Sequence, residues 1–259
     1  MLRVEATGPL VLVEDGGRPG LAPLGVGLSG AADPLALAVA NAAVGNPPDA
    51  AGLEVLVGGL VLRALAPAVV AVGPVLHELA SDEVITVAPA ADLRQYVAVA
   101  GGVDVPPVLG SRSYDTLSDL GPRPLVVGDV IAIGSAAGPA PVPSHDGLVR
   151  LHPGPRADHF HPGTLDLMVS ATWTVSSTSD RTAVRLEGPR LVRRTTEELP
   201  PEGLMVGAVQ VPPSGQPLVF GVDHPVTGGY PVIGVVERGD VRVLAQARPG
   251  ERVRFTATW

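Results

Sequence analysis

The chain of 259 residues contains no cysteine and no lysine, so its 18 Lys or Arg residues are all arginines. Without cysteine it can form no disulfide and offers no thiol nucleophile. Without lysine it has no Schiff-base amine, no Walker-type phosphate lysine and no residue that could carry biotin. A carboxylate or phosphate ligand would therefore be held by arginine, hydroxyl or backbone N–H groups.

Aromatic residues and positive charge are also scarce. Aromatics make up 3% of the chain, so a core has to be built from Val, Leu, Ala and Ile. The net charge of −8 argues against a nucleic-acid partner, because phosphate binding usually needs a basic face. The most apolar stretch, residues 60–76, is broken by Arg63, Pro67 and Pro74, so no membrane span is predicted. No secretion signal is evident, and a cytoplasmic location is expected.

Short apolar runs separated by turn residues predict a mainly β protein. Gly and Pro together number 60, and they lie between the apolar runs rather than in one low-complexity stretch. The runs expected as strands are 10–13, 55–62, 68–72, 84–87, 96–99, 125–133, 218–222 and 241–245. One helix is expected near 34–44, because Asp33 suits the N-cap, Pro34 suits the first turn and Gly45 ends the pattern. A second, short helix is expected at 164–169.

The proline-rich segment 139–147 predicts a linker between two domains, because alternate prolines cannot join a sheet ladder. The expected domains are 1–138, which includes the helix, and 148–259. Similar strings at 102–106 and 221–225 reflect either a duplicated β barrel or chance among so many Gly, Val and Pro residues.

Two glycine-rich turns in the N-terminal block flank Arg18 and Ser29. They either present an anion site or only turn the chain between strands. Ser29 also lies in a loose nucleophile-elbow pattern, but the expected β-rich pattern is not the β/α alternation that this elbow requires. One cluster of histidines contains His152, His159 and His161. It is either a zinc site, for which no third ligand at the right geometry is evident, or a polar turn, and no metal site is predicted.

The second half holds two polar clusters. Ser179, Asp180 and Arg181 either bind a carboxylate or carbonyl, or cap the end of a strand. Polar groups also gather around a Pro-Pro turn and a Gly-Gly loop; these are Gln210, Gln216, Asp223, His224, Thr227, Gly228, Gly229 and Tyr230. Asp223 and His224 are a possible acid–base pair, and a solvated hairpin is the competing interpretation.

Several of these strings occur in an order that resembles one protein family. They are Glu-Asp-Gly-Gly-Arg-Pro-Gly at 14–20, Ser-Gly-Ala-Ala-Asp at 29–33, Gly-Gly-Val-Asp-Val-Pro-Pro at 101–107, Ser-Asp-Arg at 179–181, Arg-Leu-Glu-Gly at 185–188, Gln-Val-Pro-Pro at 210–213 and Thr-Gly-Gly-Tyr-Pro at 227–231. The ordered set resembles the biotin-dependent carboxyltransferase-like family, which includes the KipA-like proteins, allophanate hydrolase subunit 2 and the 5-oxoprolinase C subunits.

The resemblance implies two tandem cyclophilin-like β barrels and a role in a complex. Such a complex also contains two partners, a KipI-like B subunit and a LamB/YcsF-like A subunit. It hydrolyses 5-oxo-L-proline to L-glutamate using ATP. The ATP is expected to bind with the partner subunits. Arg18 or Arg181 would then hold the substrate carboxylate, and Asp223 with His224 would move protons. Ser179 and Asp180 would be further catalytic residues. The other residues expected to bind the substrate are Ser29, Gln210, Gln216, Thr227, Gly228, Gly229 and Tyr230. The alternatives are carboxyl transfer from biotin on another chain, as in urea carboxylases, and a regulator that binds a KipI-like kinase inhibitor.

Overall fold

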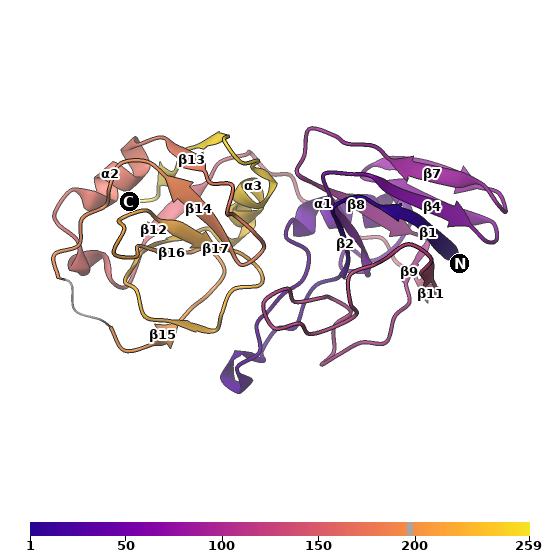
Figure 1. The fold of residues 1–259 in the computed structure, drawn as a ribbon, viewed down its shortest axis with the longest axis horizontal. Helices are drawn as coiled ribbons and strands as arrows, with labels where there is room; N and C mark the ends of the chain where they lie inside the picture. Colours follow the sequence, from indigo (N-terminus) through magenta and orange to yellow (C-terminus); the bar gives the residue numbers. More distant parts are fainter. Residues whose placement is uncertain (196–198) are drawn as a thin grey trace. The chain divides into compact units, whose positions relative to one another are not determined.

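The computed structural model describes residues 1–195 and 199–259 and divides them into two compact units (Figure 1). The first unit contains Met1–Pro19 and Ser29–Ser144, and the second contains Gly20–Leu28 and His145–Trp259. Strands predominate in both, which confirms the prediction of a mainly β fold with a few short helices. Within the described residues, no helix is long and apolar enough to cross a membrane.

The first unit is built from two curled antiparallel sheets. One has the order β10-β1-β4-β7, the other β2-β3-β8-β5-β6, and β9 pairs separately with β11. The strands are β1 (Leu2–Thr7), β2 (Leu10–Glu14), β3 (Gly52–Leu56), β4 (Leu60–Ala64), β5 (Ala68–Val72), β6 (Val75–Leu79), β7 (Val84–Val87), β8 (Arg94–Val99), β9 (Gly101–Val103), β10 (Val130–Ile131) and β11 (Ile133–Ala136).

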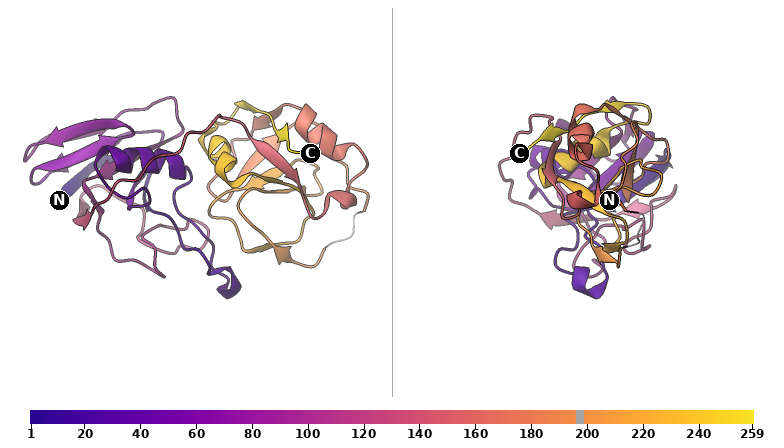
Figure 2. Two further views of the ribbon diagram at one scale, coloured as in Figure 1. Left: turned by 180° about the vertical axis from the view of Figure 1, so that it is seen from behind. Right: turned by 90° about the vertical axis from the view of Figure 1, so that its left-hand side faces the viewer.

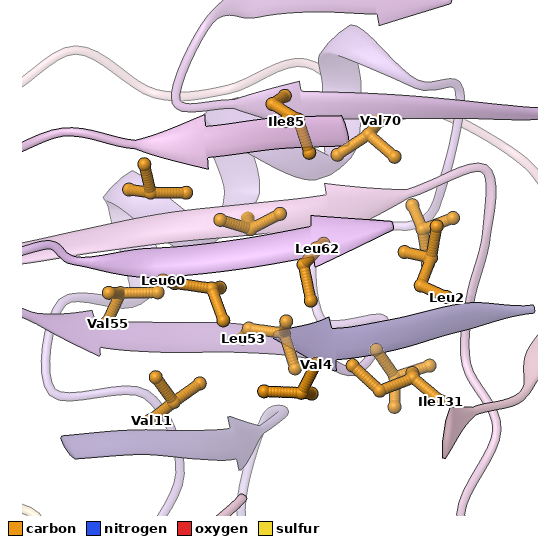
Figure 3. Packing of buried hydrophobic residues seen from close by; sticks show 14 of the residues in the cluster. Leu2, Val4, Val11, Leu53, Val55, Leu60, Leu62, Val70, Ile85 and Ile131 are labelled. Carbon is orange, nitrogen blue, oxygen red and sulfur yellow. The ribbon is translucent and has the colours of Figure 1, made fainter. Parts of the chain in front are cut away.

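Alternating apolar residues from both sheets form one aliphatic core (Figure 3). Val4 and Leu62 come from one sheet, and Leu53 and Val55 come from the other; all four are almost fully buried. Because the core contains no aromatic side chain, its stability depends on dense packing of many small aliphatic groups.

Helix α1 (Pro34–Ala43) packs on the outer face of the second sheet, where Leu37 and Ala40 meet Tyr96 and Ala98 of β8 (Figures 1 and 2). The helix begins directly after Asp33, whose carboxylate accepts a hydrogen bond from the Ala36 N–H at 3.0 Å.

The second unit is organised around one curled sheet of order β20-β13-β14-β17-β16-β19-β12-β21, and β15 pairs with β18. Its strands are β12 (Arg150–Pro153), β13 (Trp173–Val175), β14 (Ala183–Glu187), β15 (Glu202–Gly203), β16 (Ala208–Gln210), β17 (Leu218–Phe220), β18 (Thr227–Gly228), β19 (Val232–Val236), β20 (Arg252–Val253) and β21 (Thr256–Ala257). Its α-helices are α2 (Thr164–Ser170) and α3 (Val241–Gln246), and the chain has short 3₁₀ helices η1 (Ala22–Leu24), η2 (Ala157–His159) and η3 (Arg238–Asp240).

Both faces of this second sheet are buried in its centre. The inner face, with Val209, Val219 and Ile233, shares a core with residues of α2 and α3. The outer face carries a smaller cluster that includes Leu218 and Phe220. Strand alternation therefore gives β14, β16 and β17 an outer row of side chains that is separate from the core.

Three predicted strands are wrong. The run 125–133 contains a turn at 127–128, followed only by the two-residue strand β10 and the first residue of β11, which lie in different sheets. The run 241–245 forms α3, because Val241 and Leu244, three residues apart, are the buried positions, and this is helical spacing. The run 55–62 is two strands in different sheets, β3 and β4, since Val57 has a φ of +63° and two glycines follow it.

Candidate functional site

Arg18 is a buried clamp in the first unit. Its side chain is 2% exposed, and its guanidinium donates to three backbone carbonyls: Nε to Val108 at 3.0 Å, and Nη2 to Ser113 and to Leu120 (3.3 Å). Nε and Nη2 of the arginine expected to face a substrate carboxylate thus fix the segment 108–120, whereas its buried Nη1 has no hydrogen-bond partner among the described residues. Gly121 completes the clamp, because its φ is +119° and a Cβ there would lie 2.2 Å from the Ser113 carbonyl oxygen.

Asp15 fixes the same segment from the other side. Its carboxylate accepts hydrogen bonds from the hydroxyls of Ser111 at 2.5 Å and Ser113 at 2.6 Å, and from the Arg112 N–H at 2.6 Å. It also accepts from the Gly17 N–H at 2.8 Å, so it closes the glycine-rich turn on itself. This turn therefore uses its groups to hold the chain rather than to present a phosphate cradle.

Ser29 is buried in a left-handed conformation with a φ of +53°. Its hydroxyl donates to the Tyr114 carbonyl at 3.3 Å. A side chain at positive φ is strained, and this contact is one of the groups that hold it. Ser29 belongs to the first unit, and the polar clusters of the second half belong to the second unit.

A second buried network holds the start of α1 against the sheet. Glu54 accepts hydrogen bonds from the Tyr96 hydroxyl at 2.7 Å and from the Ala32 N–H at 2.9 Å, and the Tyr96 oxygen accepts from the Asp33 N–H at 2.7 Å. Burial, together with the nearby charges of Glu54 and Asp33, raises the pKa of Tyr96 well above its usual value of 10.0.

In the second unit, Arg181 and Asp223 form a buried ion pair. Nε of Arg181 lies 2.8 Å from Oδ2 of Asp223, and Nη2 lies 3.2 Å from Oδ1. The two side chains are 4% and 0% exposed. Asp223 was expected to pair with His224, and Arg181 was expected to hold a ligand. The two-point match of guanidinium and carboxylate instead joins these two residues across 42 positions of sequence.

His224 turns its ring away from that pairing. Its Nδ1 lies 2.8 Å from the Pro225 carbonyl, so Nδ1 carries the proton, and the ring tilts against Phe220 with 6.2 Å between the ring centroids. The ring is part of the packing on the outer face of the sheet, and it is 7% exposed.

Ser179 and Asp180 close the turn that leads into β14. The Ser179 hydroxyl accepts from the Arg185 N–H at 3.0 Å and donates to the Arg185 carbonyl at 3.3 Å. Asp180 accepts from the N–H groups of Thr182 at 2.8 Å and Ala183 at 3.0 Å. Of the two interpretations left open for this cluster, these contacts match the capping of a strand end.

Gln210 and Gln216 both bind backbone groups. Gln210 is buried, and its Nε2 donates to the Tyr230 carbonyl at 2.9 Å, which fixes the loop after Thr227–Gly228. Gln216 accepts from the Gly188 N–H at 2.8 Å and donates to the Gly188 carbonyl at 3.1 Å, as a neighbouring strand would. Of the Gly-Gly loop, Thr227, Gly229 and Tyr230 remain exposed.

A small cavity of about 220 Å³ lies over the outer side of β14 and β17, which are adjacent strands (Figure 1). Its polar lining consists of Ser176, Thr178, Arg185, Glu187, Ser214 and Gln216. Pro212, Pro217 and Leu218 supply apolar wall. We take this cavity as the candidate functional site, because it combines opposite charges, hydroxyls and apolar surface in a concave place.

Arg185 and Glu187 belong to the string Arg-Leu-Glu-Gly at 185–188, but the sequence did not single them out as site residues. The signal is the alternation of β14, where Ala183, Val184 and Leu186 are buried and Arg185 and Glu187 are exposed on one side. The motif at 179–181 predicted Arg181 as the ligand-binding arginine instead. Its pairing with Asp223, 42 positions later, cannot be read from the sequence.

A second cavity, of about 250 Å³, lies in the first unit. Asp15, Asp49, Asp104 and Arg112 line it, together with backbone around Gly101 and Gly134. Asp15 is engaged by the hydroxyl and N–H groups named above, and Asp104 lies 3.4 Å from Arg112. No group of three or more His, Cys, Asp or Glu residues in 1–195 and 199–259 is arranged to hold a metal ion, and His152 instead contacts Glu237 at 2.8 Å.

Comparisons with known proteins agree with one another. The profile of the family described as "Carboxyltransferase domain, subdomain A and B" matches residues 24–257. The chain is 35% identical over 287 residues to the C subunit of 5-oxoprolinase from Escherichia coli (strain K12), with 98% of this chain and 90% of that protein covered.

Solved structures show the same fold. A crystal structure of TTHA0988 matches 98% of this chain with a TM-score of 0.83 and 34% identity, and this chain spans 55% of that chain. The crystal structure of the K. lactis urea amidolyase matches 99% of this chain with a TM-score of 0.90 and 25% identity, over 18% of the amidolyase chain.

Proposed function

Because the chain belongs to the family of carboxyltransferase domains with subdomains A and B, we propose that it is the C subunit of a 5-oxoprolinase. The complex would open the lactam ring of 5-oxo-L-proline by adding water across its C–N bond, giving L-glutamate at the expense of ATP. Its proposed partners are two further chains, one KipI-like (the B subunit) and one LamB/YcsF-like (the A subunit).

One observation carries this proposal: the likeness to the C subunit of the E. coli 5-oxoprolinase covers 98% of this chain and 90% of the relative. The match therefore accounts for most of the length of that relative. In the urea amidolyase the matching region is 18% of a much longer chain. The larger share of the relative that is matched favours the activity of the C subunit over that of the amidolyase.

The residues of this chain do not fit biotin attachment or a phosphate-binding loop. Biotin is carried on lysine, and the chain has none. Nε and Nη2 of Arg18 bind backbone carbonyls, and Asp15 closes the glycine-rich turn beside it. We therefore propose that the nucleotide binds with the partner subunits, and that this chain contributes a surface for the small substrate.

The test is reconstitution of the complex. The chain is co-purified with its proposed KipI-like and LamB/YcsF-like partners. Glutamate release from 5-oxoproline is followed with and without ATP, and each protein is omitted in turn. The proposal expects ATP-dependent glutamate that disappears when this chain is left out. A well-assembled complex that releases no glutamate would overturn it.

A second candidate function is carboxyl transfer from biotin held on another chain. The TM-score of 0.90 to the urea amidolyase structure favours it. Supplying the complex with a biotinylated carrier and labelled bicarbonate would show label on urea or a related amide. If neither reaction occurs but the chain relieves inhibition of a kinase by the KipI-like protein, the regulator interpretation stands in their place.

A further inference from the structure

We propose that the cavity over β14 and β17 binds the amino-acid part of the substrate, with Arg185 holding the carboxylate and Glu187 accepting the ring N–H. This inference rests on the proposed function for the name of the substrate. Its chemistry, a ligand with a carboxylate next to an N–H group, comes from the cavity itself.

The cavity is lined by a pair of opposite charges. Arg185 and Glu187 are two positions apart on one strand, so both side chains lie on the same face. Neither forms a salt bridge within 4.0 Å among the described residues, and both line the cavity. A guanidinium and a carboxylate that share a concave place without pairing are suited to a ligand that carries both an anion and a donor.

Arg181, four positions before Arg185, already has an internal partner. Arg181 is buried and matched at two points by Asp223, so using it for a substrate would break an internal ion pair. Arg185 is exposed, and its backbone rather than its guanidinium makes the hydrogen bonds to Ser179. Of these two neighbouring arginines, Arg185 is therefore the one with a guanidinium to offer.

The size and lining of the cavity also suit a small cyclic acid. A volume of about 220 Å³ is below that of cavities for drug-sized ligands and suits a ring acid of about nine non-hydrogen atoms. Leu218 and Pro217 give apolar surface for ring methylenes. Ser176 and Thr178, whose hydroxyl oxygens are 3.3 Å apart, offer donors for a lactam carbonyl.

Side-chain hydrogen bonds fix the backbone on both sides of the two charges. Before Arg185, the Ser179 hydroxyl contacts both backbone groups of that residue. After Glu187, the Gln216 amide contacts both backbone groups of Gly188. The strand that carries the charges is thus fixed at both ends, and a site on such a strand is preorganised. Gln216 acts here as a positioning residue.

The test measures binding separately from turnover. Equilibrium binding of labelled 5-oxoproline to the purified complex is measured without ATP, for the wild type and for Arg185→Gln, Glu187→Gln and Arg238→Gln. Arg238 is an exposed arginine outside the cavity and is the matched control. Competition by 2-pyrrolidinone, which has the lactam but no carboxylate, reports on the carboxylate contact.

We expect Arg185→Gln to weaken 5-oxoproline binding by at least about tenfold and to leave 2-pyrrolidinone binding within about twofold, because only the carboxylate contact is lost. Glu187→Gln should weaken both ligands, and Arg238→Gln neither. Equal 5-oxoproline binding by wild type and Arg185→Gln would overturn the proposal, as would a wild-type complex that binds none. Arg185-dependent binding without glutamate release would support this site while overturning the proposed function.

Discussion

Replacing Arg181 by leucine would leave the carboxylate of Asp223 buried without the guanidinium that matches it at 2.8 and 3.2 Å. Breaking a buried ion pair by removing one partner costs about 3–5 kcal/mol, because the remaining charge is not hydrated. The entropy of unfolding is about 2.1 cal/mol/K per residue, so for a cooperative unit of roughly 120 residues this cost lowers Tm by about 12–20 °C. We expect this loss of stability even where no substrate is present.

The measurement is thermal unfolding followed by circular dichroism, on Arg181→Leu, Asp223→Leu and the double variant. Replacing both partners by apolar residues removes the uncompensated charge, so the double variant should recover at least half of the lost Tm. A Tm for Arg181→Leu within about 2 °C of wild type would refute the reasoning, because the pair would then contribute nothing that water cannot replace.

Further predictions concern one glycine, one tyrosine and one core leucine. Gly121→Ala should lower the free energy of unfolding by about 2 kcal/mol or more, because its Cβ would lie 2.2 Å from a carbonyl oxygen. Gly110→Ala, whose Cβ would have no atom within 4 Å, is the control and should lower it less; urea unfolding measures both. The raised pKa of Tyr96 means that stability is retained below pH 10.0 and falls as the pH rises further; absorbance at alkaline pH should show this late titration, and Tyr96→Phe should abolish it. Leu53→Ala should cost about 2–5 kcal/mol in the same unfolding assay, and a loss under about 1 kcal/mol would contradict the packing described for the core.

Local signals in the sequence predicted much of the fold. Asp33 and Pro34 mark the start of α1, and the short apolar runs predicted a mainly β chain. The prediction for 241–245 was wrong because four of its five residues are apolar or β-branched, and only the packing of Val241 and Leu244 decides for a helix.

The candidate site was less predictable, because it depends on partners far apart in sequence. Arg18, Arg181 and Gln216 were all candidate site residues, but each of them holds a backbone group or a buried charge. Arg185 and Glu187 are distinguished only by lying on the same side of a strand as the cavity. Which polar group is satisfied internally and which is left for a ligand becomes visible only in three dimensions.

The Arg18 clamp has a consequence for how the chain is synthesised. Its carbonyl partners lie 90 to 102 positions later, and β1 pairs with β10 at Ile131. A chain emerging from the ribosome therefore cannot complete its first unit until about half of the sequence has been translated. Until then the guanidinium and the free edge of β1 are exposed to water and to other chains. Translation pauses before residue 131 has left the ribosome should accordingly favour aggregation.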